Sequence, residues 1–460
     1  VAMAIFIGGP AALFWMWVTA FLGMTTKFVE VSLSHKYRTK NISGSVSGGP
    51  MLYMENGLNM KWLGIIFSFC LLVSTFGSGN MPQIDNISTT LNSSFGFNPI
   101  LSSLVITALV GLVIIGGINR IASFAGSIVP TMALIYVVGS LSVLIFNYAN
   151  ILPSFFVIIN DVFNGSAIAG GFLGASFSTA FTYGVARGLY SNEAGQGSSP
   201  IAHATSNTKH SIEEGFVSIL EPFIDTLIIC TLTGLVILAS GVWTEKYENE
   251  FEKTSLYFLS SDENQKTLES QINSYTNCRD NNVQCFSGEI NIQEGTIISK
   301  NIIFHNRSFA EDVIFLKDNE FFTGNLKIEN GMLAAEGISV KGKSLVKSAV
   351  LTSKAFNKGF FGNYGEFIVS IGLLLFAFST MITWSYYGDR CTLYLFGSKA
   401  LIYYRILYLF AMFIAGSGLI DTEVIWNFAL ITVAASTLPN LIGMFLLRKE
   451  MKSLLQDYMK

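Results

Sequence analysis

Nine apolar stretches in this chain are each long enough to cross the hydrocarbon layer of a membrane as a helix. A spanning helix needs about 20 residues. Only 13% of the 460 residues are charged and 51% are hydrophobic, whereas a soluble domain carries ~25% charged residues. This composition excludes a soluble enzyme and predicts an all-α polytopic membrane protein. The stretches lie near residues 11–34, 62–81, 99–118, 124–146, 166–190, 216–243, 367–387, 402–420 and 424–447.

A single polar segment interrupts the apolar chain. Residues 245–358 hold 16 acidic and 13 basic side chains, about half of all the charges. We expect residues 245–345 to form an insert between a first body segment, 1–244, and a second, 346–460. Residues 245–275 are polar and indicate partial helix. After Gly288, short β-branched runs separated by Gly and Asn predict a small β-rich module; these runs lie at 289–293, 296–299, 313–316 and 326–329.

The Lys and Arg residues fall in every second loop between the apolar stretches, and cytoplasmic loops hold such an excess. The pattern predicts a cytoplasmic C-terminus and an extracytoplasmic insert in a multi-pass protein of the cell (inner) membrane. Cys278 and Cys285 would then lie in an oxidising compartment, where a disulfide between them is plausible. No cysteine spacing resembles a zinc site, and we expect no metal site. A net charge of −3 gives no support for nucleic-acid binding, and the oligomeric state stays open.

Two of the apolar stretches are broken by glycine-rich polar segments, Gly77–Gln83 and Gly184–Pro200. Free backbone groups survive within a membrane only where they line a cavity or are buried in protein. Broken helices supply the amides and carbonyls that hold a carboxylate or a small cation near the middle of the bilayer. The alternative is that these small residues only allow neighbouring helices to pack closely.

A third polar feature is the hydroxyl-rich turn around Trp384. Thr380 and Trp384 are four residues apart and share a helix face, with Ser379 and Thr383 beside them. Hydroxyl oxygens suit Na+ or a substrate ammonium, and a tryptophan face adds a wall or a cation–π contact. The alternative is that the hydroxyls bond to carbonyls of their own helix and that Trp384 packs as core.

Several ionisable residues lie within or beside the apolar stretches, where such groups are functional candidates. Lys27 and Glu30, three residues apart, are expected to pair with each other. Arg187 and Glu193 bracket the second broken segment and could latch a gate or anchor the segment. The remaining candidates are the carboxylates Glu221 and Asp225, which suggest a cation or proton path, and His203 and His210, for which we expect a surface or capping role.

With these features assembled, the chain resembles the alanine or glycine:cation symporter family, the sodium:alanine symporters. The matching strings are spread over nearly the whole apolar part, and only the insert, near 245–345, is unmatched. They begin at Gly8–Trp17, Ser47–Met51 and Gly77–Met81 with Gln83, and continue at Gly184–Gly188, Ser191–Gly195, Pro200–His203, Asp225–Thr226, Gly241–Trp243, Trp384–Gly388 and Pro439–Asn440.

The resemblance implies a LeuT-like fold of two inverted five-helix repeats and sodium-driven uptake of a small neutral amino acid, with no cofactor besides the coupling Na+. The nine helices would be the second to tenth of the core, so the family's first broken helix would end near Val1. Pro82 departs from the family pattern. The implied substrate contacts are Gly79, Asn80, Gln83, Asn192, Thr380 and Trp384, with Ser379, Thr380 and Thr383 at the cation and Arg187 and Glu193 as gating residues.

On this interpretation, Gly79 and the face of Trp384 would set the room for the substrate side chain, and Gln83 and Thr380 would hold its polar end. Three alternatives stay open. One is a proton-coupled amino-acid symporter, and another is a membrane-anchored sensor that uses the insert as its binding module. A channel would be expected to show rings or repeats of pore-lining charge, which the sequence lacks.

Overall fold

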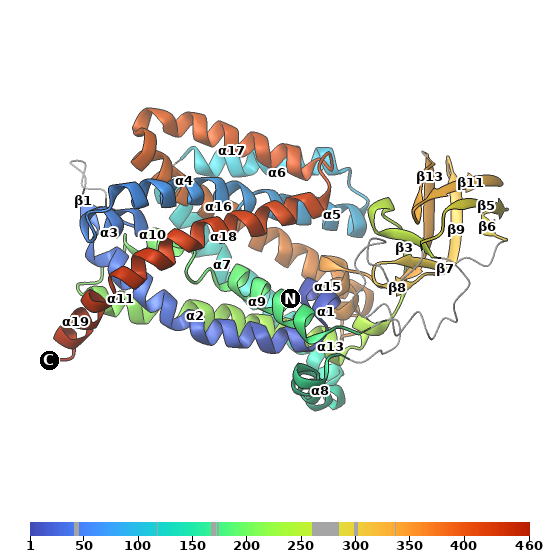
Figure 1. Cartoon of the computed structure of the whole chain (residues 1–460), viewed down its shortest axis with the longest axis horizontal. Helices are drawn as coiled ribbons and strands as arrows, with labels where there is room; N and C mark the ends of the chain where they lie inside the picture. The colour runs from blue at the N-terminus through green and yellow to red at the C-terminus, as the bar shows by residue number, and fades with distance from the viewer. Residues whose placement is uncertain are drawn as a thin grey trace. The chain divides into compact units, whose positions relative to one another are not determined.

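The computed structural model describes residues 1–40, 46–116, 118–166, 172, 174–259, 285–298, 302–335 and 337–460. Most of these residues are helical (Figure 1). A π-helix, Phe223–Cys230, joins α12 to α13. The helices are α1 (Ala2–Gly8), α2 (Ala11–Lys36), α3 (Pro50–Asn56), α4 (Lys61–Gly77), α5 (Met81–Phe95), α6 (Pro99–Ile114), α7 (Ile118–Phe146), α8 (Ile151–Asn164), α9 (Phe177–Asn192), α10 (Ser199–His203), α11 (Ser211–Ser218), α12 (Leu220–Pro222), α13 (Thr231–Ala239), α15 (Ser348–Asn357), α16 (Gly365–Phe396), α17 (Leu401–Gly416), α18 (Thr422–Leu446) and α19 (Arg448–Tyr458).

Seven of the nine predicted spans are confirmed among the described residues as helical segments long and apolar enough to cross a membrane. The third predicted span is the shorter apolar helix α6, and the fifth is described mainly as α9. Helix α8 was not predicted, because its 14 residues are too few to span. The seven segments are Ala11–Lys36, Lys61–Asn92, Gly126–Phe146, Ser211–Ala239, Gly362–Phe396, Ser398–Gly416 and Thr422–Leu446.

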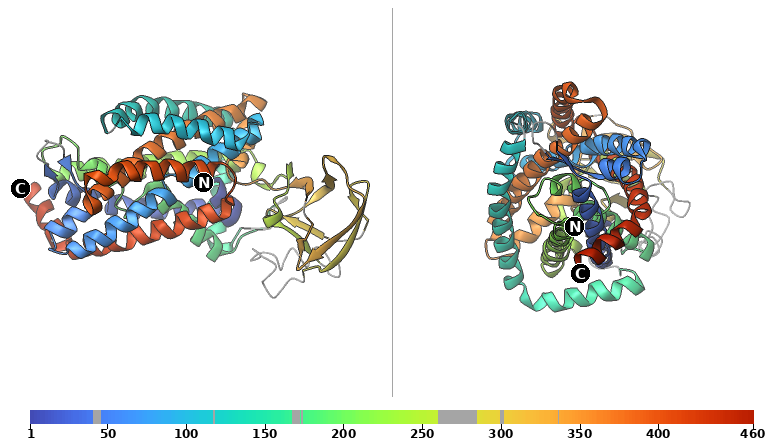
Figure 2. Two further views of the ribbon diagram at one scale, coloured as in Figure 1. Left: turned by 90° about the horizontal axis from the view of Figure 1, so that it is seen from above. Right: turned by 90° about the vertical axis from the view of Figure 1, so that its left-hand side faces the viewer.

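The described chain divides into two compact units. The first comprises Val1–Trp15, Ser142–Gly184 and Thr233–Gly362, and the second comprises Met16–Leu141, Val185–Leu232 and Asn363–Lys460. In the second unit, α4 packs against α3, α16 and α18, while α17 packs against α5 and α6. Figures 1 and 2 show these helices running beside one another. The polar residues discussed below lie among them.

The helices of the second unit expose large apolar side chains on their outward faces. Phe410, Ile431 and Leu438 are each more than half exposed. Such faces would be costly in water, but a lipid bilayer solvates them. Their distribution agrees with a multi-pass membrane protein.

Two helices of the second unit are interrupted by glycines. Helix α4 ends at Gly77 and α5 begins at Met81, where Pro82 fits the helix start because no backbone donor is needed there. After α9 ends at Asn192, the backbone is left-handed at Glu193 (φ 53°), Gly195 (φ 81°) and Gly197 (φ 76°). Both glycine-rich segments predicted as helix breaks are therefore non-helical at Ser78–Asn80 and Glu193–Ser198.

The first unit contains the β-rich insert, which confirms the β-rich module predicted from the sequence. Its strands form antiparallel sheets in the orders β10-β9-β13-β3, β12-β11-β5-β6 and β4-β7-β8, coloured green to orange in Figure 2. The strands are β3 (Tyr247–Glu250), β4 (Leu256–Leu259), β5 (Gly288–Gln293), β6 (Thr296–Ile297), β7 (Ile302–His305), β8 (Ser308–Phe309), β9 (Glu311–Lys317), β10 (Glu320–Phe321), β11 (Gly324–Glu329), β12 (Met332–Leu333) and β13 (Ile338–Ser344).

Alternating side chains from these strands build a separate apolar core that includes Phe258, Ile292 and Phe315. Only residues 245–259 of the range 245–275 are described, so the partial helix expected in that range stays a prediction. The described part of that range contains β3, β4 and only one short 3-10 turn, because pairing of β3 with β13 and of β4 with β7 satisfies its backbone. Cys278 lies outside the described residues, so its disulfide with Cys285 stays a prediction.

Candidate functional site

Trp384 and Gly79 are in direct contact at the break between α4 and α5. Trp384 lies on α16 and is buried. A Cβ atom on Gly79 would lie 2.2 Å from both Cβ and Cγ of Trp384, closer than atoms can approach. Only glycine therefore lets the indole pack on this backbone. The two residues predicted to limit the room at the site are brought together.

The polar edge of the same indole is held by Glu193. Trp384 Nε1–H donates a hydrogen bond to Glu193 Oε1 at 3.0 Å. The other carboxylate oxygen, Oε2, accepts from the Ser198 hydroxyl at 2.6 Å. Glu193 thus links the broken segment after α9 to the face of α16.

Gln83 belongs to a second polar cluster. Its side-chain amide donates to the carbonyl of Ser78 at 3.2 Å and to the Tyr190 hydroxyl oxygen at 3.3 Å. Tyr190 also donates to the Ser78 carbonyl at 3.0 Å. The guanidinium of Arg187 lies 4.1 Å from the ring centroid of Trp426, which in turn packs on Tyr190.

The two predicted gating residues consequently lie in different clusters. Arg187 stacks on Trp426, and the Glu193 carboxylate faces Trp384 and Ser198. Their positions at the second broken segment suggested a gate latch or an anchor for the segment, and α9 ends between them at Asn192. The structure instead connects each residue to a different aromatic side chain.

Asn80 and Asn192 each stand at the edge of a broken helix and are fully buried. The Asn80 amide donates to the carbonyl of Tyr408 at 2.7 Å, and Asn192 Oδ1 accepts from the amide of Ala194 at 3.0 Å. Within the described residues, Asn80 Oδ1 and Asn192 Nδ2 have no hydrogen-bond partner. Buried polar groups are rarely left unpaired, so these two atoms are available to a ligand.

The hydroxyls beside Trp384 donate to carbonyls of their own helix. Ser379 and Thr380 donate to the carbonyl of Phe376 at 2.8 and 2.9 Å, and Thr383 donates to that of Ser379 at 2.9 Å. Bonding of these hydroxyls to carbonyls of their own helix is what we expected as the alternative to a cation or substrate site. Each hydroxyl oxygen still keeps lone pairs with which it could accept a cation.

Lys27 is the centre of a buried charge cluster. Its ammonium donates to the Ser199 hydroxyl and lies 3.1 Å from Glu221 and 3.8 Å from Glu30. The predicted pair of Lys27 with Glu30 is therefore present, but Glu221 on α12 is nearer. Lys27 is fully buried, and such a charge is tolerated only when it is paired.

The Glu30 carboxylate ties this cluster to the broken segment. One oxygen accepts from the amide of Gly195 at 3.3 Å, and the other accepts from Asn440 at 2.8 Å. Asn440 also donates to the carbonyl of Gly195 at 2.9 Å and accepts from the hydroxyl of Tyr53. Side chains from α2, α3 and α18 therefore hold the segment around Gly195.

His203 lies between two carboxylates instead of at a free surface. Its Nδ1 is 2.6 Å from Glu214, and its Nε2 is 3.8 Å from Glu221. Burial alone would lower the pKa of His203, but hydrogen bonds and charges from Glu221 and Glu214 raise it above its ordinary value. His203 ends α10, and carboxylates from two later helices, α11 and α12, converge on it. His210 packs against the ring of Tyr458.

Asp225 is separate from Glu221 in its contacts. It accepts hydrogen bonds from Ser191 at 2.5 Å and from Thr226 at 3.0 Å. Residues four apart, such as Glu221 and Asp225, share one face of an α-helix. The π-helix that begins at Phe223 changes the spacing there, because it has more residues per turn.

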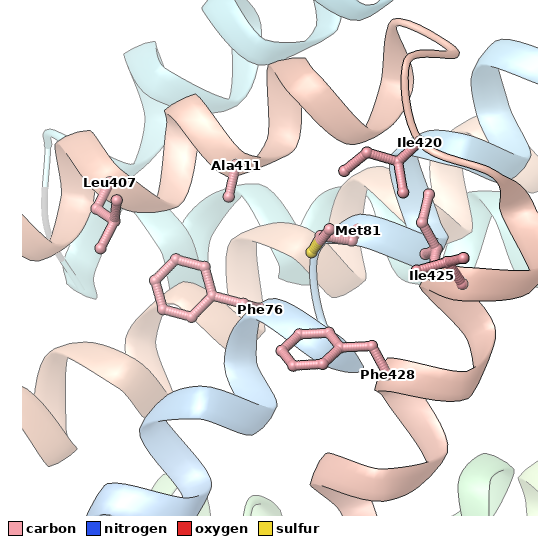
Figure 3. Close-up of a pocket in the computed structure, with 8 residues that line it drawn as sticks. Phe76, Met81, Leu407, Ala411, Ile420, Ile425 and Phe428 are labelled. Atoms are coloured by element: carbon pink, nitrogen blue, oxygen red, sulfur yellow. The ribbon is translucent and has the colours of Figure 1, made fainter.

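An apolar pocket of about 430 Å³ lies beside the first broken segment (Figure 3). Phe76 and Met81 flank the break, and α17, α18 and Ile420 in the connection between them supply the rest of the lining. All of the lining side chains are apolar, so this pocket offers no partner for a carboxylate or an ammonium. The lining residues are Phe76, Met81, Leu407, Ala411, Ile420, Val424, Ile425 and Phe428.

Sequence reasoning did not single out three residues that the structure places at these clusters. Tyr190 contacts Gln83, Trp426 stacks on Arg187, and Tyr408 accepts from Asn80 through its backbone carbonyl. All three are aromatic residues of apolar stretches, where they resemble ordinary core residues. What marks them as site residues is their proximity to polar groups on other helices, which only the folded structure reveals.

Comparison with known proteins places this arrangement in a family. The family model described as "Sodium:alanine symporter family" matches residues 1–264 and 331–460. An uncharacterized transporter of Haemophilus influenzae is 32% identical over 459 residues, which cover 100% of this chain and 79% of the relative. The sodium/alanine symporter AgcS of Methanococcus maripaludis is 34% identical over 451 residues, which cover 97% of this chain and 77% of AgcS.

A further relative matches about half of the chain. The probable sodium/glutamine symporter GlnT of Bacillus subtilis is 38% identical over 243 residues, which cover 53% of this chain and 50% of GlnT. These relatives differ in the amino acid named, but the named functions are all transport across a membrane. The family is one of transporters, not of enzymes. The chain belongs to the sodium:alanine symporter family of multi-pass membrane proteins.

Proposed function

We propose that this chain couples sodium entry to the uptake of a small neutral amino acid, alanine or glycine, by alternating access. Membership of the sodium:alanine symporter family supports sodium and an amino acid as the transported pair. The name of AgcS, a sodium/alanine symporter 34% identical to this chain, supports alanine. The name of GlnT makes a larger neutral amino acid the competing possibility.

The packing of Trp384 on Gly79 is the observation that carries the preference for a small substrate. No atom fits between the Gly79 backbone and the indole, and Glu193 holds the indole at its N–H. A wall fixed in this way leaves little space for a long side chain. A methyl group or a hydrogen is the side chain that suits such a site.

The polar ends of the amino acid need complementary partners. Asn80 Oδ1 is a buried acceptor for the ammonium group, and Asn192 Nδ2 is a buried donor for the carboxylate. We assign Gln83 to the same polar end. Hydroxyl oxygens on α16 complete the cation site of the proposal, which comprises Ser379, Thr380 and Thr383.

For the architecture, we propose a LeuT-like fold of two inverted five-helix repeats, in which 1–244 and 346–460 are the first and second parts of the transporter body. Residues 245–345 would be an extracytoplasmic insert, and the C-terminus would lie in the cytoplasm. The two broken helices support the repeat, because transporters of this kind use broken helices near the bilayer midplane. The alternation of basic loops supports the orientation.

Uptake of radiolabelled alanine into proteoliposomes tests the proposed function. The purified full-length protein is reconstituted, and an inward sodium gradient is compared with an equal potassium gradient. We expect accumulation only with sodium, and excess unlabelled glycine should reduce it. Absence of sodium-dependent uptake of alanine and glycine alike would refute the proposal.

Proton coupling is the second candidate, and the buried charge cluster favours it. Lys27, Glu30, Glu221 and His203 form a connected set of ionisable groups inside the second unit. Connected groups of this kind serve as proton relays in other transporters. An inward proton gradient without sodium distinguishes the two, because alanine would accumulate only if protons drive transport.

A further inference from the structure

We propose that Glu193 is a positioning residue that holds Trp384 in place and thereby sets the upper size of the substrate side chain. The inference rests on the proposed function, since it concerns the selectivity of that same site. It assigns to the carboxylate a role different from the gate latch expected with Arg187.

The first step is that two contacts, one at each end of the side chain, fix the orientation of the Trp384 indole. An indole has one hydrogen-bond donor, Nε1–H, and in Trp384 this donor meets Glu193 Oε1 at 3.0 Å. The opposite constraint comes from Gly79, whose backbone packs on Cβ and Cγ of the same side chain. A steric contact at the root of the side chain and a directional hydrogen bond at its far edge together leave one orientation.

The second step is that Glu193 is itself held in place. Its carboxylate accepts from Ser198 at 2.6 Å, and its backbone has a left-handed φ of 53°. A residue with a Cβ adopts this conformation at a cost, and it persists only where its surroundings over-determine it. The side-chain bonds to Ser198 and Trp384 are the surroundings that retain Glu193 in this conformation.

The third step is the effect of losing the bond between Trp384 and Glu193. Without its acceptor, Trp384 would keep a buried N–H group that has no partner at this position, and the indole would rotate to find one. The wall beside the substrate would then move, while the groups proposed for the ammonium and carboxylate would stay. Selectivity between small and large side chains should change more than the affinity for alanine.

Four variants separate this role from a merely structural one. Trp384→Phe keeps an aromatic ring but removes the donor, and Glu193→Ala removes the acceptor. Glu193→Gln keeps a carbonyl oxygen at the same reach and should preserve the orientation. The matched control is Glu55→Ala, because the Glu55 carboxylate accepts from Tyr394, also on α16, at 2.7 Å and lies outside the proposed site.

The measurement is the ratio of dissociation constants for leucine and alanine, determined with each purified full-length protein in the presence of sodium. We expect Glu193→Ala and Trp384→Phe to lower this ratio by roughly 10-fold or more, because each variant loses one charge-assisted hydrogen bond. The parent, Glu193→Gln and Glu55→Ala should keep the high ratio.

The outcomes distinguish the inference from the function on which it rests. If the parent binds neither alanine nor glycine with sodium, the proposed function fails. If the parent binds alanine and both Glu193→Ala and Trp384→Phe keep the parental ratio, the positioning role is overturned. If Glu193→Ala does not fold, a parental ratio in Trp384→Phe overturns the positioning role, because that variant removes the donor and leaves Glu193 in place.

Discussion

Replacement of Gly79 by alanine tests the tightest contact at the proposed site. The new Cβ would lie 2.2 Å from Cβ and Cγ of Trp384, whereas carbon atoms pack at about 3.5 Å or more. The indole or the backbone must therefore move by about 1.3 Å. Overpacking of this kind costs roughly 1–3 kcal/mol, and a displaced indole would also lose its bond to Glu193, worth about 1.5–3 kcal/mol.

We expect Gly79→Ala to weaken sodium-dependent alanine binding by roughly 10- to 100-fold, since each 1.4 kcal/mol is a factor of ten. The assay is equilibrium binding of alanine to purified protein, with thermal unfolding measured on the same sample. Gly126→Ala is the matched control, because a Cβ at Gly126 on α7 meets no atom within 4 Å. Parental alanine affinity and stability in Gly79→Ala would refute the reasoning about this contact.

Three further predictions concern other parts of the molecule. Gln83→Ala should weaken alanine binding by roughly 10- to 100-fold, because it removes a hydrogen bond to a charged substrate; unchanged binding would remove Gln83 from the site. An impermeant thiol reagent should label Lys327→Cys but not Lys452→Cys in intact cells, and the reverse result would invert the proposed orientation. Burial and the Lys347 charge lower the pKa of His305 to about 3. As the pH falls below about 6.5, the unfolded insert binds a proton at His305 and the folded insert does not. The insert should therefore lose roughly 2 kcal/mol of stability by pH 5, which hydrogen exchange can measure, and the His305→Gln variant should not show this loss.

The sequence was sufficient for the features that depend on local pattern. Apolar length predicted the spans, and glycine-rich interruptions predicted the breaks at Ser78–Asn80 and after Asn192. The change to short β-branched runs predicted the insert. Helical spacing also predicted the pair of Lys27 with Glu30, because residues three apart share a face.

Contacts between distant helices were beyond the sequence. The bond from Trp384 to Glu193 joins residues 191 positions apart, and the nearest carboxylate to Lys27 is Glu221, not its helical neighbour Glu30. No periodicity encodes which faces meet. Arg187 and Glu193 bracket the second broken segment in the sequence, but only the fold shows that they contact different aromatic side chains; their gating role stays a prediction.

Four very short edge strands of the insert affect how neighbouring copies of the protein can interact. Among its described strands, β6, β8, β10 and β12 each have two residues and each lies at the edge of a sheet. An edge of that length offers too few free amides and carbonyls to recruit a strand from a neighbouring chain. Crowded copies of the protein in one membrane can therefore display their inserts side by side without these edges joining into a shared sheet.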